Sequence, residues 1–117
     1  MNNFRELVVW QKSIEFVVKI YEITRDYPKE EKFNLISQMQ RAATSIPTNI
    51  AEGAGRNTNP LFKHFLTISI GSAHELETQI IISKKLSYIN EENCEKLVFE
   101  LSGIQKMLYG LHNSLQY

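Results

Sequence analysis

The spacing of apolar residues along the chain predicts four helices and no strand. The first helix is indicated by apolar positions that step by four, three and four residues, the spacing of one helix face: Trp10, Ile14, Val17 and Tyr21. Pro28 ends this pattern. A second run extends from Leu35 to Ile50 after the acidic segment "KEEK", and Gly53 and Gly55 end it. Two amphipathic helices therefore occupy the first half of the chain.

The second half of the chain predicts two longer helices. Asn59 is the expected N-cap of the third helix, with Pro60 at its first helical position, and Asn90 is the expected N-cap of the fourth. One face of the third helix carries Phe62, Phe65, Ser69, Ala73, Leu76, Ile80 and Ser83. One face of the fourth carries Cys94, Leu97, Leu101, Ile104, Leu108, Leu111 and Leu115. The sequence thus predicts an all-α, antiparallel up-down-up-down four-helix bundle, with residues 1–117 as one domain.

The first and third helices carry more apolar surface than one bundle needs. Their second stripes consist of Val9, Phe16, Ile20 and Ile23 in the first helix, and Ile68, Ile70, Ile81 and Ile82 in the third. A helix that is apolar on two sides is normally buried on both. We therefore predict a homo-oligomer with closed rotational symmetry in which these two stripes form the subunit contacts. The alternative is that some of these residues lie at the edges of a wide core stripe.

The second helix carries a row of polar residues that fall within about 80° of one another at 100° per residue. This polar ridge consists of Arg41, Ser45, Asn49, Glu52 and Arg56. It forms one face only if the helix continues through Pro47, which removes a backbone donor. Three interpretations stay open: a buried network that pairs Arg41 with Glu52 or Glu75, a subunit contact or binding surface, and an ordinary solvated face.

Composition limits the partners of this chain. Of its 117 residues, 43% are hydrophobic and 22% charged, and Lys plus Arg equals Asp plus Glu at 13 each. Zero net charge predicts no bulk attraction to nucleic acid or to an anionic membrane, so any basic site must be local. The start has no signal-peptide core, and no stretch reaches the roughly 20 apolar residues of a spanning helix. With Cys94 as the only cysteine, we expect a cytoplasmic protein that lacks a membrane segment and an intrachain disulfide.

The chain carries no recognisable catalytic or metal-binding pattern. A di-iron bundle needs Glu-x-x-His, and none of His64, His74 and His112 has a glutamate three residues before it. The segment "GAGRNTNP" follows a helix and lacks the ending of a phosphate loop. Cys94 lies on the core face of the fourth helix, where a cysteine is normally a small apolar residue. We therefore expect neither an enzyme nor a metal or cofactor site.

Three segments of the chain resemble a known family. They are "FRELVVWQKSIEF" from Phe4, "QRAATSIPTNIAEGAGR" from Gln40 and "FLTISIGSAHELETQ" from Phe65. They are similar to the bacterial four-helix bundle proteins also called intervening-sequence proteins of large-subunit ribosomal RNA genes. The family pattern falls on Trp10, Arg41, Ser45, Asn49, Glu52, Gly53, Arg56, Gly71, Glu75 and Glu77.

The resemblance implies a homopentamer of four-helix bundles. It also relates the chain to the accessory protein of diversity-generating retroelements, a similar pentamer that binds nucleic acid and a reverse transcriptase. Those accessory proteins are strongly basic, and this chain departs from them in being neutral. The predicted site for RNA, DNA or a nucleic-acid-handling protein is the polar ridge together with the adjoining turn: Arg41, Ser45, Asn49, Glu52, Arg56, Lys63 and His64. Within it, Arg41, Arg56, Lys63 and His64 form a local basic patch around the turn between the second and third helices. The alternative is a purely structural, self-assembling protein without an external ligand.

Overall fold

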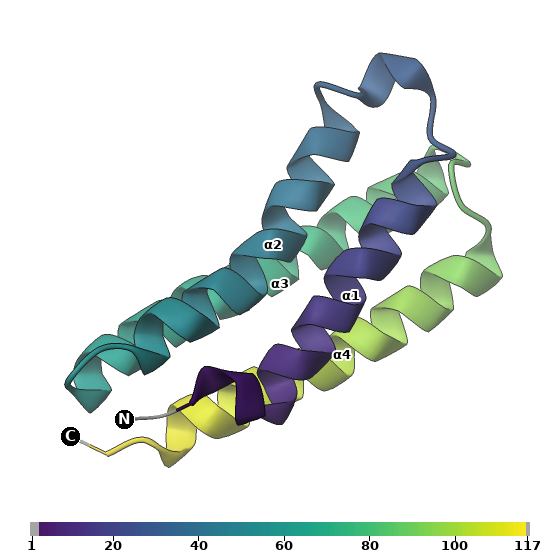
Figure 1. Cartoon of the computed structure of the whole chain (residues 1–117). Coiled ribbons are helices and arrows are strands. Elements are labelled where there is room, and N and C mark those ends of the chain that lie inside the picture. The colour runs from purple at the N-terminus through teal and green to yellow at the C-terminus, as the bar shows by residue number, and fades with distance from the viewer. Residues whose placement is uncertain (1–2, 117) are drawn as a thin grey trace.

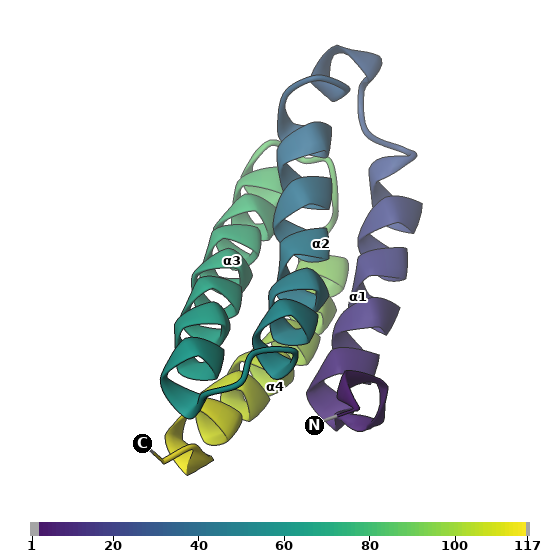
Figure 2. The ribbon, with the colours of Figure 1, turned by 60° about the vertical axis from the view of Figure 1, so that its left-hand side comes forward.

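Four α-helices account for most of residues 3–116, the part of the chain that the computed structural model describes. They are α1 (Val8–Thr24), α2 (Leu35–Ala54), α3 (Asn59–Lys85) and α4 (Glu91–Ser114), and the short 3-10 helices η1 (Phe4–Glu6) and η2 (Lys29–Glu31) precede α1 and α2. Successive helices run in opposite directions, and α2 lies between α1 and α3 (Figures 1 and 2). The predicted all-α four-helix bundle is confirmed.

Helix starts follow local capping rules, with two small departures from expectation. Asn90 caps α4 as predicted, because its Oδ1 accepts from the backbone N–H of Asn93 at 2.7 Å. The N-cap of α3 is Thr58 and not Asn59; its Oγ1 accepts from the N–H of Leu61 at 3.4 Å. The "KEEK" segment forms η2 and a turn, so α2 begins only at Leu35.

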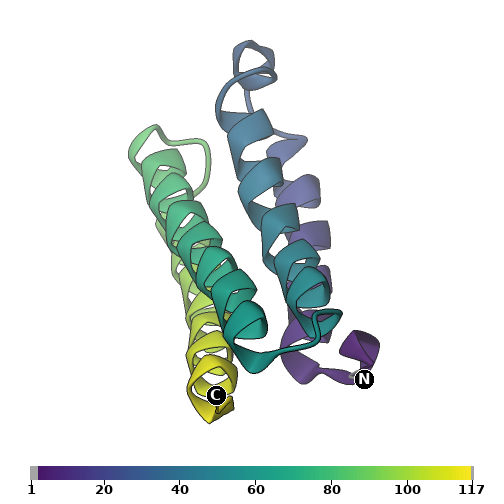
Figure 3. The same cartoon turned by 90° about the vertical axis from the view of Figure 1, so that its left-hand side faces the viewer.

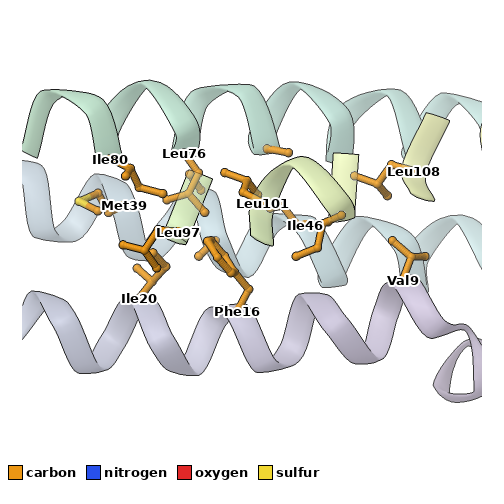
Figure 4. Packing of buried hydrophobic residues seen from close by; sticks show 14 of the residues in the cluster. Val9, Phe16, Ile20, Met39, Ile46, Leu76, Ile80, Leu97, Leu101 and Leu108 are labelled. Atoms are coloured by element: carbon orange, nitrogen blue, oxygen red, sulfur yellow. The ribbon is translucent and has the colours of Figure 1, made fainter. Parts of the chain in front are cut away.

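The core runs the length of the bundle and takes one face from each helix (Figure 4). The predicted face of α4 is confirmed, because its first five members are buried: Cys94, Leu97, Leu101, Ile104 and Leu108. The α2 face that includes Met39, Ile46 and Ile50 is likewise buried. Among the described residues, no helix combines the length and apolarity needed to cross a membrane.

The two faces of α1 are partly reversed relative to the prediction, because of the four residues expected in the core only Trp10 and Val17 pack against it, and both are half-buried. Val9, Phe16 and Ile20 were assigned to an outer stripe, and that assignment is wrong, because these side chains are buried and point from α1 into the core (Figure 4). Ile14 and Tyr21, which were expected in the core, are 38% and 41% exposed. The predicted outer stripe of α1 therefore cannot form subunit contacts.

Two buried hydroxyl residues explain why the core face of α1 was misjudged. The buried stripe includes Ser13 and Thr24, whose polar side chains interrupt the apolar pattern. Ser13 Oγ donates to the carbonyl of Val9 at 2.6 Å, and Thr24 Oγ1 donates to that of Ile20 at 2.8 Å. Because each hydroxyl is satisfied within its own helix, it can be buried at little cost. Ile23, the fourth member of the predicted outer stripe, is half-buried and packs against the core.

The second stripe of α3 divides into two parts. Ile70 is half-buried and packs against the core, so it is not an outer residue. Ile68, Ile81 and Ile82 are exposed, and their role in assembly stays a prediction. On the core face, Leu66 is fully buried whereas Phe65 is only half-buried.

At the far end of the bundle from the chain termini, two tyrosines connect the interhelical loops. The rings of Tyr27 and Tyr88 lie 5.2 Å apart between centroids. Tyr88 Oη donates to Glu31 Oε2 at 2.8 Å, and this hydrogen bond raises the pKa of Tyr88 above its usual value. Burial raises the pKa of Tyr27. These contacts link the α1–α2 connection to the α3–α4 turn.

At Gly53, α2 packs closely on α3. A Cβ atom at Gly53 would lie 2.8 Å from Phe62 Cδ1 and 2.9 Å from Phe65 Cβ. Real Cβ atoms essentially never come so close, so any side chain here would push the helices apart. At Gly55 the nearest atoms to such a Cβ are ordinary contacts at 3.6 and 3.7 Å.

We predict that Gly53→Ala destabilises the fold although alanine is the better helix former. Overpacking of a filled interface costs about 1–3 kcal/mol, which for a chain of this size corresponds to a fall in Tm of roughly 5–10 °C. Thermal unfolding at fixed protein concentration measures the effect. Gly55→Ala is the matched control and should leave Tm within roughly 2 °C of the wild-type value; equal Tm values for both variants would contradict the predicted clash.

Candidate functional site

The α2 helix continues through Pro47, so the five residues of the polar ridge do share one helix face, with Arg56 just beyond its end. They do not share one environment. Ser45 and Asn49 are half-buried where α2 meets α3, whereas Arg41, Glu52 and Arg56 are exposed. The ridge therefore combines an internal part and an external part.

The internal part of the polar ridge bonds α2 to α3. Ser45 Oγ and Ser72 Oγ lie 2.8 Å apart, at hydrogen-bond distance. Asn49 Nδ2 donates to the carbonyl oxygen of Ser45 at 2.9 Å and to its Oγ at 3.0 Å. Next to this group, Ser69 Oγ of α3 donates to the carbonyl of Ile46 at 2.9 Å. The region around Pro47 is thus held to α3 by small hydrogen-bonding side chains.

The external part centres on Arg56, which follows the end of α2. Its Nη2 donates to Glu52 Oε2 at 3.0 Å, with the two side chains 44% and 53% exposed. The guanidinium carbon lies 4.8 Å from the ring centroid of Phe65 on α3. His64 contacts the same ring edge to face at 5.4 Å. The ring and the carboxylate therefore orient Arg56 while leaving it accessible.

The predicted basic patch is smaller than expected, because Arg41 is not at the α2–α3 turn. Fifteen residues separate it from Arg56, which is about 22 Å along a helix. Arg41 is exposed and forms no ion pair with another described residue, so the interpretation in which a buried network pairs Arg41 with Glu52 or Glu75 is wrong. Glu52 pairs with Arg56 instead. Only Arg56, Lys63 and His64 lie together at the turn and the first turns of α3.

A groove beside the external part was not predicted from the sequence. It has a volume of about 620 Å³ and is lined by η1, the start of α1 and the last turns of α2. Its walls include Phe4, Trp10, Pro47, Ala51 and Glu52. The rings of Phe4 and Trp10 meet edge to face at 5.3 Å. Trp10 had been assigned to the core from its spacing, so its half-exposed position was missed.

The described residues contain no arrangement typical of a metal or thiol-dependent enzyme. Between residues 3 and 116, no three His, Cys, Asp or Glu side chains are placed to hold a metal ion. Cys94 is buried in the core. The chemistry available at this site is therefore that of an exposed arginine, a carboxylate, an imidazole and aromatic rings.

Comparisons with known proteins agree with this architecture. The family model for the 23S rRNA-intervening sequence protein matches residues 5–110. A crystal structure from Bacteroides thetaiotaomicron, described as a protein with unknown function from the S23 ribosomal protein family, is similar with a TM-score of 0.84 and 30% identity. The match covers 92% of this chain and 96% of that one. No functionally curated protein matches the chain.

We predict that Asn49→Ala lowers stability, because it removes the amide that donates twice to Ser45. The loss of such hydrogen bonds costs about 1 kcal/mol, equivalent to a Tm lower by roughly 4 °C. Thr48→Ala is the control, since Thr48 is the exposed neighbour of Asn49 on the same helix. A Tm for Asn49→Ala that is no lower than that of Thr48→Ala would show that the bonds from Asn49 to Ser45 do not stabilise the fold.

Proposed function

Because the chain belongs to the 23S rRNA-intervening sequence protein family, we propose that it is a non-enzymatic, homo-oligomeric bundle that binds RNA at Arg56 and its neighbours. The names of the family and of the Bacteroides relative refer to ribosomal RNA and to a ribosomal protein family. That relative is itself of unknown function, so the main support for RNA binding comes from the contacts of Arg56. The resemblance to pentameric bundles supports a pentamer as the assembly.

The observation that carries this proposal is the placement of Arg56 on the ring of Phe65. A guanidinium stacked on an aromatic ring keeps its outward N–H groups available, and its planar fork matches a phosphate. His64 packs edge to face against the same ring and helps to hold it in place, and Lys63 precedes His64 in the sequence. Proteins that bind single-stranded or looped RNA combine such cations with aromatic surfaces.

The neutral charge of the chain sets the expected strength of binding. Affinity for nucleic acid grows with the number of phosphates neutralised, and one copy offers only a few cations here. A single copy should therefore bind weakly and lose its ligand at moderate salt. In an oligomer the same patch is repeated in every copy, so a long RNA that reaches two patches gains affinity through avidity.

A second candidate function is purely structural, with the polar ridge serving only to fix α2. Its specific support is the internal part of the ridge, where Ser45 and Asn49 bond within α2 and to Ser72. This candidate accounts for Ser45 and Asn49, but it gives no role to the exposed Arg41 and Arg56. The two candidates therefore differ in what they predict for the arginines.

We predict that Arg56→Ala weakens binding of a structured RNA, measured by fluorescence anisotropy across a salt titration. Loss of one phosphate contact should lower the slope of log K against log salt by about one unit. Arg41→Ala should have a smaller effect, because Arg41 lies about 22 Å away along α2. Lys96→Ala is the control for charge, since Lys96 pairs with Glu92 on the exposed face of α4.

Three results would decide between the candidates. Weaker binding in Arg56→Ala with unchanged binding in Lys96→Ala supports the RNA site. Equal weakening in both variants would mean that only overall charge matters and would contradict a site at Arg56. No binding by the wild-type protein at low salt would contradict the RNA function and favour the structural one.

A further inference from the structure

A row of outward residues on α3 has the spacing of a second helix-packing seam. The positions alternate by three and four residues, which is the heptad pattern of helices that pack side by side. This α3 outer stripe consists of Leu61, His64, Ile68, Gly71 and Glu75, and Ile82 lies seven residues beyond Glu75 on the same face. Leu61, Ile68 and Ile82 are 46%, 39% and 42% exposed. The stripe lies outside the core and no described segment of the same chain covers it.

Helix α1 and the residue after it carry a matching row. This α1 outer stripe also alternates by three and four: Gln11, Ile14, Val18, Tyr21 and Arg25. Its three central members are exposed apolar or aromatic side chains, with Val18 at 54%. Arg25 has helical backbone angles, so it continues the stripe by one position beyond the end of α1. Two of its members, Ile14 and Tyr21, had been expected in the core.

Gly71 at the middle of the α3 outer stripe has no explanation within one chain. A Cβ built at Gly71 meets nothing within 4 Å, in contrast to Gly53. The same is true of Gly103 and Gly110 on α4, so Gly71 differs from them by its place on the α3 outer stripe. Glycine inside a helix costs roughly 0.5–1 kcal/mol relative to alanine. No internal contact of the bundle requires the missing side chain. A large side chain from another molecule would use the space that Gly71 leaves.

We propose that the α1 outer stripe of one copy packs in parallel against the α3 outer stripe of a second copy, with Tyr21 on Gly71 and Arg25 facing Glu75. The inference deepens the homo-oligomeric part of the proposed function and rests on it. A single offset of 50 residues aligns every layer: Gln11 with Leu61, Ile14 with His64, Val18 with Ile68, Tyr21 with Gly71, and Arg25 with Glu75. The largest side chain of one stripe meets the smallest residue of the other, and the arginine meets the carboxylate.

The topology of the bundle favours this parallel arrangement in a ring. Helices α1 and α3 run in the same direction and lie at diagonal corners without contacting each other in the described chain (Figure 3). Copies related by rotation about an axis along the bundle all point the same way, so α1 of one copy is parallel to α3 of its neighbour. Each copy then uses one stripe for each neighbour, which is the head-to-tail contact that builds cyclic oligomers.

The register also constrains the tilt of each bundle. Within one chain, the bond between Thr24 and Gln40 fixes the height of α1 against α2, and the bond between Ser45 and Ser72 fixes the height of α2 against α3. Together they place Tyr21 at the height of about residue 74 of its own α3, which is ~5 Å farther along the helix axis than Gly71. In a ring this displacement arises when each bundle is inclined to the rotation axis. Packed helices commonly cross at about 20°, and a comparable inclination suffices.

An antiparallel pairing of the two stripes fits less well. If Arg25 is kept opposite Glu75 with the helices antiparallel, Tyr21 falls beside Gln79. Gln79 is buried within its own bundle and does not belong to the outer stripe. The antiparallel pairing therefore loses the match of large and small residues that the parallel pairing keeps.

Solution mass by light scattering, measured over a range of protein concentrations, tests the pairing. Gly71→Leu should raise the protein concentration at which the oligomer half-dissociates by at least tenfold. The Tm of the protomer should not fall, because leucine is a better helix former than glycine. Gly110→Leu is the matched control, since a Cβ at Gly110 also meets nothing within 4 Å and α4 carries neither stripe. It should leave the assembly intact.

A charge exchange tests the register itself. Arg25→Glu and Glu75→Arg should each weaken assembly, because each places like charges opposite one another, and the double variant should recover most of the wild-type mass. An oligomeric wild type that is unaffected by Gly71→Leu and by both single exchanges would overturn the pairing, while RNA binding and oligomer formation would stand. A wild type that is monomeric at every concentration would overturn both the pairing and the homo-oligomeric function. Loss of RNA binding in Arg56→Ala with an intact oligomer supports the RNA site. The pairing of the α1 and α3 outer stripes is then decided separately, by the solution masses of the Gly71, Arg25 and Glu75 variants.

Discussion

Where α2 meets α3 at Gly53, the backbone of one helix approaches the Phe62 and Phe65 side chains of the other so closely that a methyl group would not fit. The position of the external site depends on this approach. It brings the ring of Phe65 beneath Arg56, and it places Ser72 within hydrogen-bond distance of Ser45. Hydroxyl-bearing residues along the contact form hydrogen bonds, Ser45 with Ser72 and Ser69 with the carbonyl of Ile46, so these polar groups have partners where they are buried or half-buried. The arginine site is therefore a product of the packing that holds the bundle together.

Hydroxyl groups have a second effect on the architecture. Ser13, Thr24 and Ser83 each occupy a buried position and donate to a backbone carbonyl four residues earlier in the same helix. They fill core space that larger apolar residues would otherwise occupy. On the surface, by contrast, α1 and α3 carry exposed isoleucine, valine and tyrosine side chains. The same helices therefore carry hydroxyl residues in the core and apolar residues on the surface.

Prediction from the sequence succeeded where one physical signal acted alone. The α4 face and the Asn90 cap were predicted correctly, because leucine spacing and a capping asparagine have no competing interpretation there. The faces of α1 were partly reversed, because the helix is apolar on two sides and its core face contains Ser13 and Thr24. The polar ridge was found, yet its division into internal and external parts depends on the direction of α3, which no local pattern encodes. The groove beside Trp10 was missed because η1 has to fold back on α2 to form it.

The short connection between α2 and α3 has a consequence for how the chain folds. Only residues 55–58 separate the two helices that pack most closely, so this hairpin closes a small loop at little entropic cost. Contacts between α1 and α4, such as the ion pair of Lys19 with Glu100, close a loop of about 80 residues. They can form only after most of the chain between them has folded. The surface that carries Arg56 is thus the first part of the molecule expected to become ordered, ahead of the bundle to which it belongs.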